Sequence, residues 1–176
     1  MIVQARHGSV RLSDDESRET RFSAEAASSD PTRESYCTVL RAHRFLWAHQ
    51  NEILEAYNDK HLNTQDIALE LPTGTGKTLI GLLIAEFRRR RLEDRALYLA
   101  PTRQLAHQVG GLARQYGIPA EVCLAPAYEG MNRWMLGGRI AVTVYSSLFN
   151  VNPVFGIPNT IILDDAHAAE DYLADH

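Results

Sequence analysis

Cysteine is scarce in this sequence, and long apolar runs are missing. Only Cys37 and Cys123 occur among 176 residues, far apart, so neither a disulfide framework nor a cysteine-based metal site is expected. No apolar stretch reaches the roughly 20 residues that cross a bilayer, and the first residues lack the apolar segment of a secretory signal. We therefore expect a soluble, cytoplasmic protein with no membrane partner.

An excess of one charge sign is also lacking. Lys and Arg number 18 against 22 Asp and Glu, a formal net charge of -4, which argues against a strongly basic nucleic-acid coat but leaves room for a local basic groove. The seven His residues show no metal-ligand spacing. The basic run 88–91 ends a predicted helix, where cations complement the helix dipole, and we interpret it as a solvated face.

The length and composition suit one globular domain. Hydrophobic residues make up 45% and charged residues 23%, and a chain of this size can bury a core. Residues 1–35 are rich in Ser, Asp, Glu and Arg and poor in large apolar residues, which favours a mobile N-terminal arm. The domain itself is expected over residues 36–176.

Short apolar runs alternate with helical stretches along the rest of the chain. The pattern predicts helices at 44–57, 77–91 and 102–116, and strands at 67–71, 96–100, 121–124, 140–145 and 160–163. Nearly continuous apolar strands that alternate with helices are typical of a mainly parallel sheet covered on both faces. The predicted fold class is α/β.

The segment Leu-Pro-Thr-Gly-Thr-Gly-Lys-Thr, residues 71–78, lies between a predicted strand and a predicted helix. Gly74 and Gly76 allow a tight turn and a close approach of backbone to phosphate, while the start of the helix offers unpaired N–H groups. Lys77 is suited to the β- and γ-phosphates, and the Thr78 hydroxyl to Mg²⁺. The alternative is a glycine-rich turn followed by a chance Lys-Thr pair.

A second chemical signal follows the strand predicted at 160–163. This strand runs directly into Asp164 and Asp165. In phosphoryl transfer one such acid holds the Mg²⁺ shell and a second polarises the attacking water. Neighbouring parallel strands would bring Lys77 and Asp164 to the same sheet edge.

Four segments together resemble the first RecA-like domain of superfamily 2 helicases of the DEAD/DEAH kind. They are Leu-Trp-Ala-His-Gln at 46–50, the loop at 71–78, Ala-Pro-Thr-Arg-Gln-Leu-Ala at 100–106, and Asp-Asp-Ala-His at 164–167. The resemblance implies a three-layer RecA-like P-loop NTPase that binds ATP and Mg²⁺ and acts on RNA or DNA. By the same resemblance, Gln50 would read the adenine, and Thr73, Gly74, Thr75, Gly76, Lys77 and Thr78 would hold the phosphates.

The resemblance also assigns the remaining site residues. Lys77, Asp164 and Asp165 would be catalytic; Thr78 and Asp164 would hold the metal; Pro101, Thr102 and Arg103 would touch the nucleic-acid backbone; and His167 would couple hydrolysis to a second RecA-like domain. Taken alone, Gln50 and Arg103 are also compatible with exposed helix positions that have no binding role. Backbone N–H groups at the start of the helix at 102–116 favour the phosphate-binding interpretation.

This sequence departs from the family pattern in three places. Asp165 replaces the usual Glu and is one methylene shorter, and Val144 replaces a common Thr in a segment at 142–148 that resembles the next backbone-contacting motif. The chain stops at His176, before the coupling motif and the second domain, so we expect a truncated domain with little activity of its own. A non-catalytic nucleotide-binding fragment or interaction module is the alternative. A transporter ATPase is disfavoured because no Leu-Ser-Gly-Gly-Gln-like signature occurs.

Overall fold

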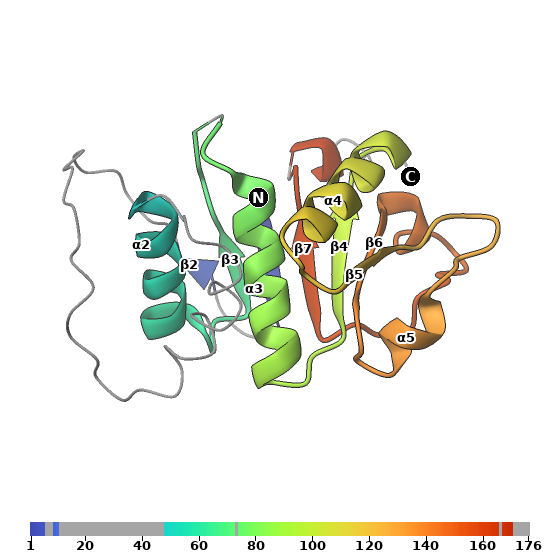
Figure 1. The fold of residues 1–176 in the computed structure, drawn as a ribbon, viewed down its shortest axis with the longest axis horizontal. Coiled ribbons are helices and arrows are strands. Elements are labelled where there is room, and N and C mark those ends of the chain that lie inside the picture. Colours follow the sequence, from blue (N-terminus) through green and yellow to red (C-terminus); the bar gives the residue numbers. More distant parts are fainter. Residues whose placement is uncertain (6–8, 11–47, 73, 166, 171–176) are drawn as a thin grey trace.

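Seven strands form one sheet in the computed structural model, which describes residues 1–5, 9–10, 48–72, 74–165 and 167–170. The strand order is β2-β3-β1-β7-β4-β6-β5 (Figure 1). The strands are β1 (Ile2–Ala5), β2 (Ser9–Val10), β3 (Asp66–Ala68), β4 (Ala96–Ala100), β5 (Ala120–Val122), β6 (Ile140–Val144) and β7 (Thr160–Leu163). The helical elements are α2 (Ala48–Ala56), the π-helix η1 (Tyr57–His61), α3 (Lys77–Arg91), α4 (Arg103–Gln115), α5 (Met131–Met135) and the 3₁₀-helix η2 (Tyr145–Ser147).

The sheet is mainly parallel, which confirms the predicted α/β class. Strand β4 pairs in parallel with both β6 and β7, and β5 with β6. Helix α4 connects β4 to β5 and helix α5 connects β5 to β6, the kind of crossover that parallel neighbours require. The predicted strands at 96–100 and 160–163 and the helix at 77–91 have the bounds of β4, β7 and α3.

Strand β1 is the exception to the parallel arrangement. It lies between β3 and β7 and is antiparallel to both, with Val3 opposite Ile67 on one side and Ile162 on the other. Residues 2–5 and 9–10 are therefore part of the sheet, which differs from the arm expected for this end of the chain. Val3 is fully buried, and this burial explains why so short a strand is held in place. Residues 6–8 and 11–47, where most of the expected arm falls, lie outside the described residues.

Two other expectations changed in extent. The first strand is shorter than expected, because β3 ends at Ala68 and not at residue 71. The first helix begins at Ala48 within the described residues and continues into the π-helix to His61, while residues 44–47 lie outside them. Helix α5 was not anticipated.

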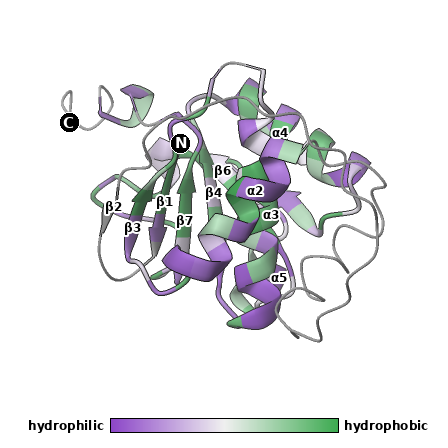
Figure 2. Ribbon diagram, turned by 90° about the vertical axis from the view of Figure 1, so that its left-hand side faces the viewer, coloured by the Kyte–Doolittle hydropathy of each residue, from purple (hydrophilic) through white to green (hydrophobic). Residues whose placement is uncertain are grey.

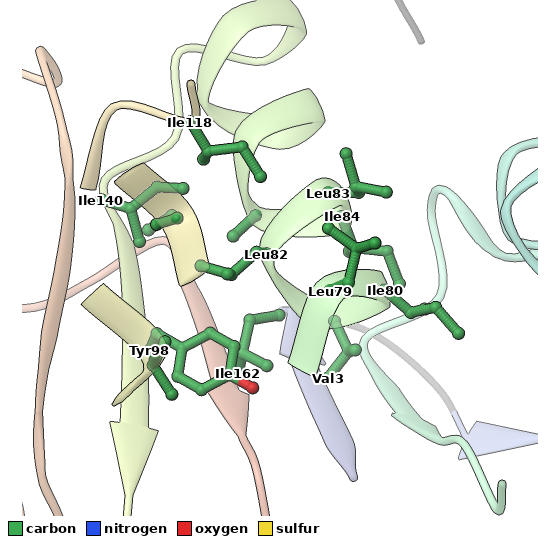
Figure 3. Close-up of a cluster of buried hydrophobic side chains, with 14 of the residues drawn as sticks. Val3, Leu79, Ile80, Leu82, Leu83, Ile84, Tyr98, Ile118, Ile140 and Ile162 are labelled. Atoms are coloured by element: carbon green, nitrogen blue, oxygen red, sulfur yellow. The ribbon is translucent and has the colours of Figure 1, made fainter. Parts of the chain in front are cut away.

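The larger part of the core lies between the sheet and helices α3 and α4. Ala96, Tyr98 and Ala100 of β4 alternate toward this side, and the buried side chains of α3 fill the layer above them (Figure 3). The labelled members of this cluster are Val3, Leu79, Ile80, Leu82, Leu83, Ile84, Tyr98, Ile118, Ile140 and Ile162. Helix α3 is therefore fixed over the centre of the sheet by apolar packing.

A second apolar cluster uses the other side of the central strands, where Leu97 and Leu99 alternate with the residues of the first cluster. Its largest member is Trp134 of α5, which is 1% exposed. The indole Nε1 donates to the Ala96 carbonyl over 3.0 Å, and the ring meets Phe155 edge-on at a centroid distance of 5.1 Å. Trp134, for which the sequence suggested no role, is thus a core anchor.

The basic run at the end of α3 is only in part the solvated face that we expected. Arg88 is 8% exposed and its Nε lies 2.8 Å from Asp94 Oδ2. Arg89 and Arg90 both pair with Glu86, which is fully buried. The helical period explains the difference, because positions three and four apart place these arginines beside Glu86. Arg90 and Arg91 remain exposed, as predicted.

Hydropathy separates the helices. Figure 2 shows α3 as largely hydrophobic and α2 as more hydrophilic, in agreement with the burial of ten consecutive residues of α3 from Leu79 to Arg88. Across the described part of the chain, none of the helices combines the length and the apolar character needed to cross a bilayer.

Candidate nucleotide site

The chain turns sharply between β3 and α3. Gly74 has φ of 86° and Gly76 has φ of 78°, both in the left-handed region that favours glycine. Gly76 precedes the first residue of α3, and its carbonyl accepts the first helical hydrogen bond from Ile80 N over 3.1 Å. The positive end of α3 and its unpaired N–H groups therefore face the loop.

A buried glutamine from α2 fixes this turn. Gln50 is 6% exposed, and its Nε2 donates to the Thr75 carbonyl over 2.9 Å. A Cβ built on Gly76 would lie 2.5 Å from that same nitrogen, so the contact requires glycine at position 76. His49 Nε2 lies 3.3 Å from the Thr75 carbonyl as well. Side chains of helix α2 thus hold the loop by contacting a backbone carbonyl of the loop.

Strand β7 delivers the first carboxylate to the same sheet edge. Asp164 follows the strand directly, and its backbone N donates to Leu99 O of β4 over 3.1 Å. The side chain is partly buried, and this burial raises the pKa of Asp164, opposed by the nearby Tyr98 hydroxyl and by the positive charges of the Met1 amine and Lys77. The neighbours of the Asp164 carboxylate thus compensate only in part for the hydration that it loses on burial.

The second carboxylate has a structural contact of its own. Asp165 is exposed, and its Oδ1 accepts from His167 N over 3.1 Å and from Ala168 N over 3.3 Å, the geometry of a helix cap for the turn at 167–170. The Tyr145 hydroxyl donates to the Asp165 carbonyl over 2.6 Å. Burial raises the pKa of Tyr145 to about 12, so this hydroxyl keeps its proton.

An open cavity of about 1140 Å³ joins the loop and the acidic pair. It brings together eight of the residues predicted from sequence, namely Gly74, Gly76, Lys77, Thr78, Pro101, Asp164, Asp165 and His167. Gln50 and Thr75 are not among the residues that line the cavity, and the Gln50 side chain donates to the Thr75 carbonyl. Thr73 lies outside the described residues.

The predicted nucleic-acid contacts are only partly gathered here. Pro101 lines the cavity, whereas Thr102 and Arg103 are exposed beyond it. The Thr102 hydroxyl caps α4 by accepting from Leu105 N over 3.2 Å, and Arg103 Nη2 donates to the Ala125 carbonyl over 3.0 Å. Both side chains therefore have local partners in addition to their position at the start of a helix.

Sequence reasoning missed the contribution of β1. Met1 and Ile2 line the cavity, and the Met1 amine donates to the Leu69 carbonyl over 3.2 Å. Burial and the charge of Lys77 lower the pKa of this amine. No local pattern in residues 1–5 indicates the position, because it depends on pairing with strands more than 60 residues away.

The oxygen donors present suit magnesium. Thr78, Asp164 and Asp165 line one cavity, and Mg²⁺ is typically bound by one or two carboxylates together with substrate phosphates and water. Within the described residues, no group of three or more His, Cys, Asp or Glu side chains forms an all-protein metal cage.

Two comparisons relate this geometry to known proteins. A family model described as "DEAD/DEAH box helicase" matches residues 47–175. Reverse gyrase 2 of Aquifex aeolicus (strain VF5) is 30% identical over 89 residues, which are 48% of this chain and 7% of that relative. The chain thus matches a small part of the relative's length, and no solved structure matches it. Since the family match spans most of the chain, from the glutamine helix through the phosphate loop to the acidic strand end, this protein belongs to the DEAD/DEAH box helicase family.

Proposed function

We propose that this chain binds ATP with Mg²⁺ and hydrolyses it as the motor domain of a nucleic-acid helicase. Membership of the family implies an ATP-binding domain of the helicase type. The observation that supports the finer proposal is that Lys77, Thr78, Asp164 and Asp165 line the same cavity.

The phosphates would lie at the start of α3. The glycine turn and the N–H groups there form an anion site, and within the described residues Lys77 forms no ion pair that would compete with a phosphate. Gln50 holds the loop from behind and would present the rest of its amide to the adenine. The base and the phosphate loop would thereby be placed by one side chain.

Thr78 and Asp164 would hold the metal. When bound, Mg²⁺ neutralises charge that develops on the β- and γ-phosphates. Asp165 would orient the attacking water, although its carboxylate is one methylene shorter than the usual Glu and also caps the turn at 167–170. His167 lines the cavity and is exposed, and it would couple ATP hydrolysis to a second RecA-like domain.

The nucleic-acid backbone, RNA or DNA, would approach the start of α4. Pro101, Thr102 and Arg103 lie there, and the N–H groups of a helix start are suited to a phosphate. This contact carries no base specificity by itself.

The test is calorimetric titration of residues 1–176 with a non-hydrolysable ATP analogue and Mg²⁺. Lys77→Ala removes a cation that would face two anionic oxygens, so binding should weaken by about 2 kcal/mol, the usual contribution of a charged hydrogen bond. The sequence has one other lysine, exposed Lys60 of η1, and Lys60→Ala is the matched control with unchanged affinity. Equal affinity of the Lys77 variant and the parent would refute the proposal.

A nucleotide-binding module without turnover is the second candidate. It is favoured by the two N–H groups that already engage Asp165 Oδ1. A steady-state ATPase assay with and without single-stranded RNA or DNA separates the two. An arginine finger adds about 10³- to 10⁵-fold in related phosphoryl transfers. We therefore expect turnover that is slow and unstimulated in residues 1–176, and stimulated only in a protein that also carries a second RecA-like domain.

A further inference from the structure

Tyr98 lies at the middle of β4, under the first turns of α3, and is fully buried. Figure 3 shows its ring beside Ile162 in the layer between the sheet and the helix. A Cβ built on Gly81 would lie 3.1 Å from Tyr98 Cε2 and 3.1 Å from Ile162 Cγ2. The small residue at position 81 therefore leaves room for the ring to lie directly against the helix.

The strand register places the hydroxyl of Tyr98 at the acidic end of the cavity. Tyr98 is opposite Ile162 in β7, so Asp164 lies two residues further along the same face. Thr78 precedes Gly81 by three positions and shares its face of α3. Both side chains lie near enough to the Tyr98 hydroxyl to change its pKa.

This proximity stops short of full hydrogen bonds. Tyr98 Oη is buried and has no partner of standard hydrogen-bond geometry among the described residues. Burial and the Asp164 charge raise the pKa of Tyr98, so the hydroxyl keeps a proton to donate. A buried hydroxyl without a full bond is unusual in a folded protein, and here it lies against the two side chains expected to hold the metal.

We propose that Tyr98 is a positioning residue for the magnesium end of the nucleotide site, accepting a hydrogen bond from the Thr78 hydroxyl and donating one to the Asp164 carboxylate. This rests on the proposed function, in which those two oxygens hold the metal. The hydroxyl hydrogen of Thr78 then points away from the cation, and the lone pairs of the hydroxyl oxygen point toward the cation. Asp164 is held in one orientation by a donor beneath it. Neighbours that orient metal ligands typically contribute 10- to 100-fold in metal affinity.

Tyr98→Phe tests the proposal because it removes the hydroxyl and keeps the ring against Gly81. The measurement is the dissociation constant of a non-hydrolysable ATP analogue in saturating Mg²⁺ and in EDTA, with the ratio of the two as readout. We expect the tightening by Mg²⁺ to shrink at least about 10-fold in the variant, with binding in EDTA and the melting temperature unchanged. A purely structural tyrosine would instead change stability and leave the ratio alone.

Tyr57→Phe is the matched control. Its hydroxyl is also buried beside α3, but it accepts from Arg88 Nη1 over 3.1 Å at the opposite end of that helix. This variant should keep the parental ratio. A parental ratio in Tyr98→Phe would overturn the positioning role while leaving the proposed function standing. A parent protein that binds no nucleotide, or binds it equally with and without Mg²⁺, would overturn the proposed function and this role with it.

Discussion

Helix α3 has charged groups at both ends, but these groups are paired within the protein at one end and open to a cavity at the other. At the C-terminal end, the Arg88 guanidinium contacts Asp94, Thr160, Tyr57 and the Leu62 carbonyl, all at 2.6–3.1 Å. At the N-terminal end, Lys77 and Thr78 face an open cavity, and Asp164 has a raised pKa because burial is only partly compensated.

The difference separates charges that are paired within the fold from charges that would bind the proposed nucleotide and metal. Removal of a buried cation leaves its partners unpaired and destabilises the native state, whereas a site that binds phosphate and metal must leave its donors unsatisfied by the protein. The two ends of α3 therefore predict opposite responses to mutation. Loss of a charge should lower stability at the first end and ligand affinity at the second.

The largest effect is expected from Arg88→Met, which keeps the apolar stem and removes the charge. The buried Asp94 carboxylate would lose its cation and, among the described residues, keep only the Thr160 hydroxyl as a donor, so the free energy of unfolding should fall by about 3–5 kcal/mol. Urea unfolding followed by circular dichroism measures this loss. Arg91→Ala, at the exposed end of the same run, is the control and should change stability by no more than about 0.5 kcal/mol. A similar small loss in both variants would mean that the Arg88 network does not stabilise the fold.

A second prediction concerns the independence of the two ends. Lys77 and Arg88 are 11 residues apart in one helix, a separation of roughly 16 Å along the axis at the usual rise, and effects at such distances add. Nucleotide at 100 times its dissociation constant should stabilise the parent by about 2.7 kcal/mol and the Arg88→Met protein by the same amount. Thermal unfolding with and without the nucleotide measures both increments. A much smaller increment in the Arg88 variant would show that its network also shapes the nucleotide site.

The smallest effect is expected from Asp164→Asn, which should raise stability where Arg88→Met lowers it. Since burial raises the pKa of Asp164 in the folded state, this group contributes stability below its usual pKa of 3.8, and the contribution is lost as pH rises through the raised value. The Asn variant lacks that loss, so at pH 7 it should melt slightly above the parent, and the gain should disappear toward pH 3.5. Melting temperatures across this pH range test the prediction. Asp94→Asn, at the other end of α3, should lower the melting temperature at pH 7, and a loss of stability in both variants would contradict the contrast between the ends.

The sequence by itself determined the elements and residues whose signals are local. An unbroken apolar run specifies β4 and β7, and a glycine turn followed by Lys-Thr specifies the start of α3, where we propose the phosphate site. Asp164 and Asp165 were identified because a strand that ends in two acids has few structural uses. These inferences need only neighbouring residues, and the cavity confirms that they meet in space.

The tertiary structure decided the contacts between residues that are distant in the chain. The insertion of β1 beside β7 pairs residues about 160 positions apart, and Arg88 meets Thr160 across 72 positions. In the sequence, Tyr98 is indistinguishable from the other apolar residues of its strand. The strand register places it on the same face of the sheet as Asp164, and the two side chains lie close together. Such roles are set by which strands become neighbours and which face a side chain takes, and both follow from the packing of the whole sheet against α3 and not from any local pattern.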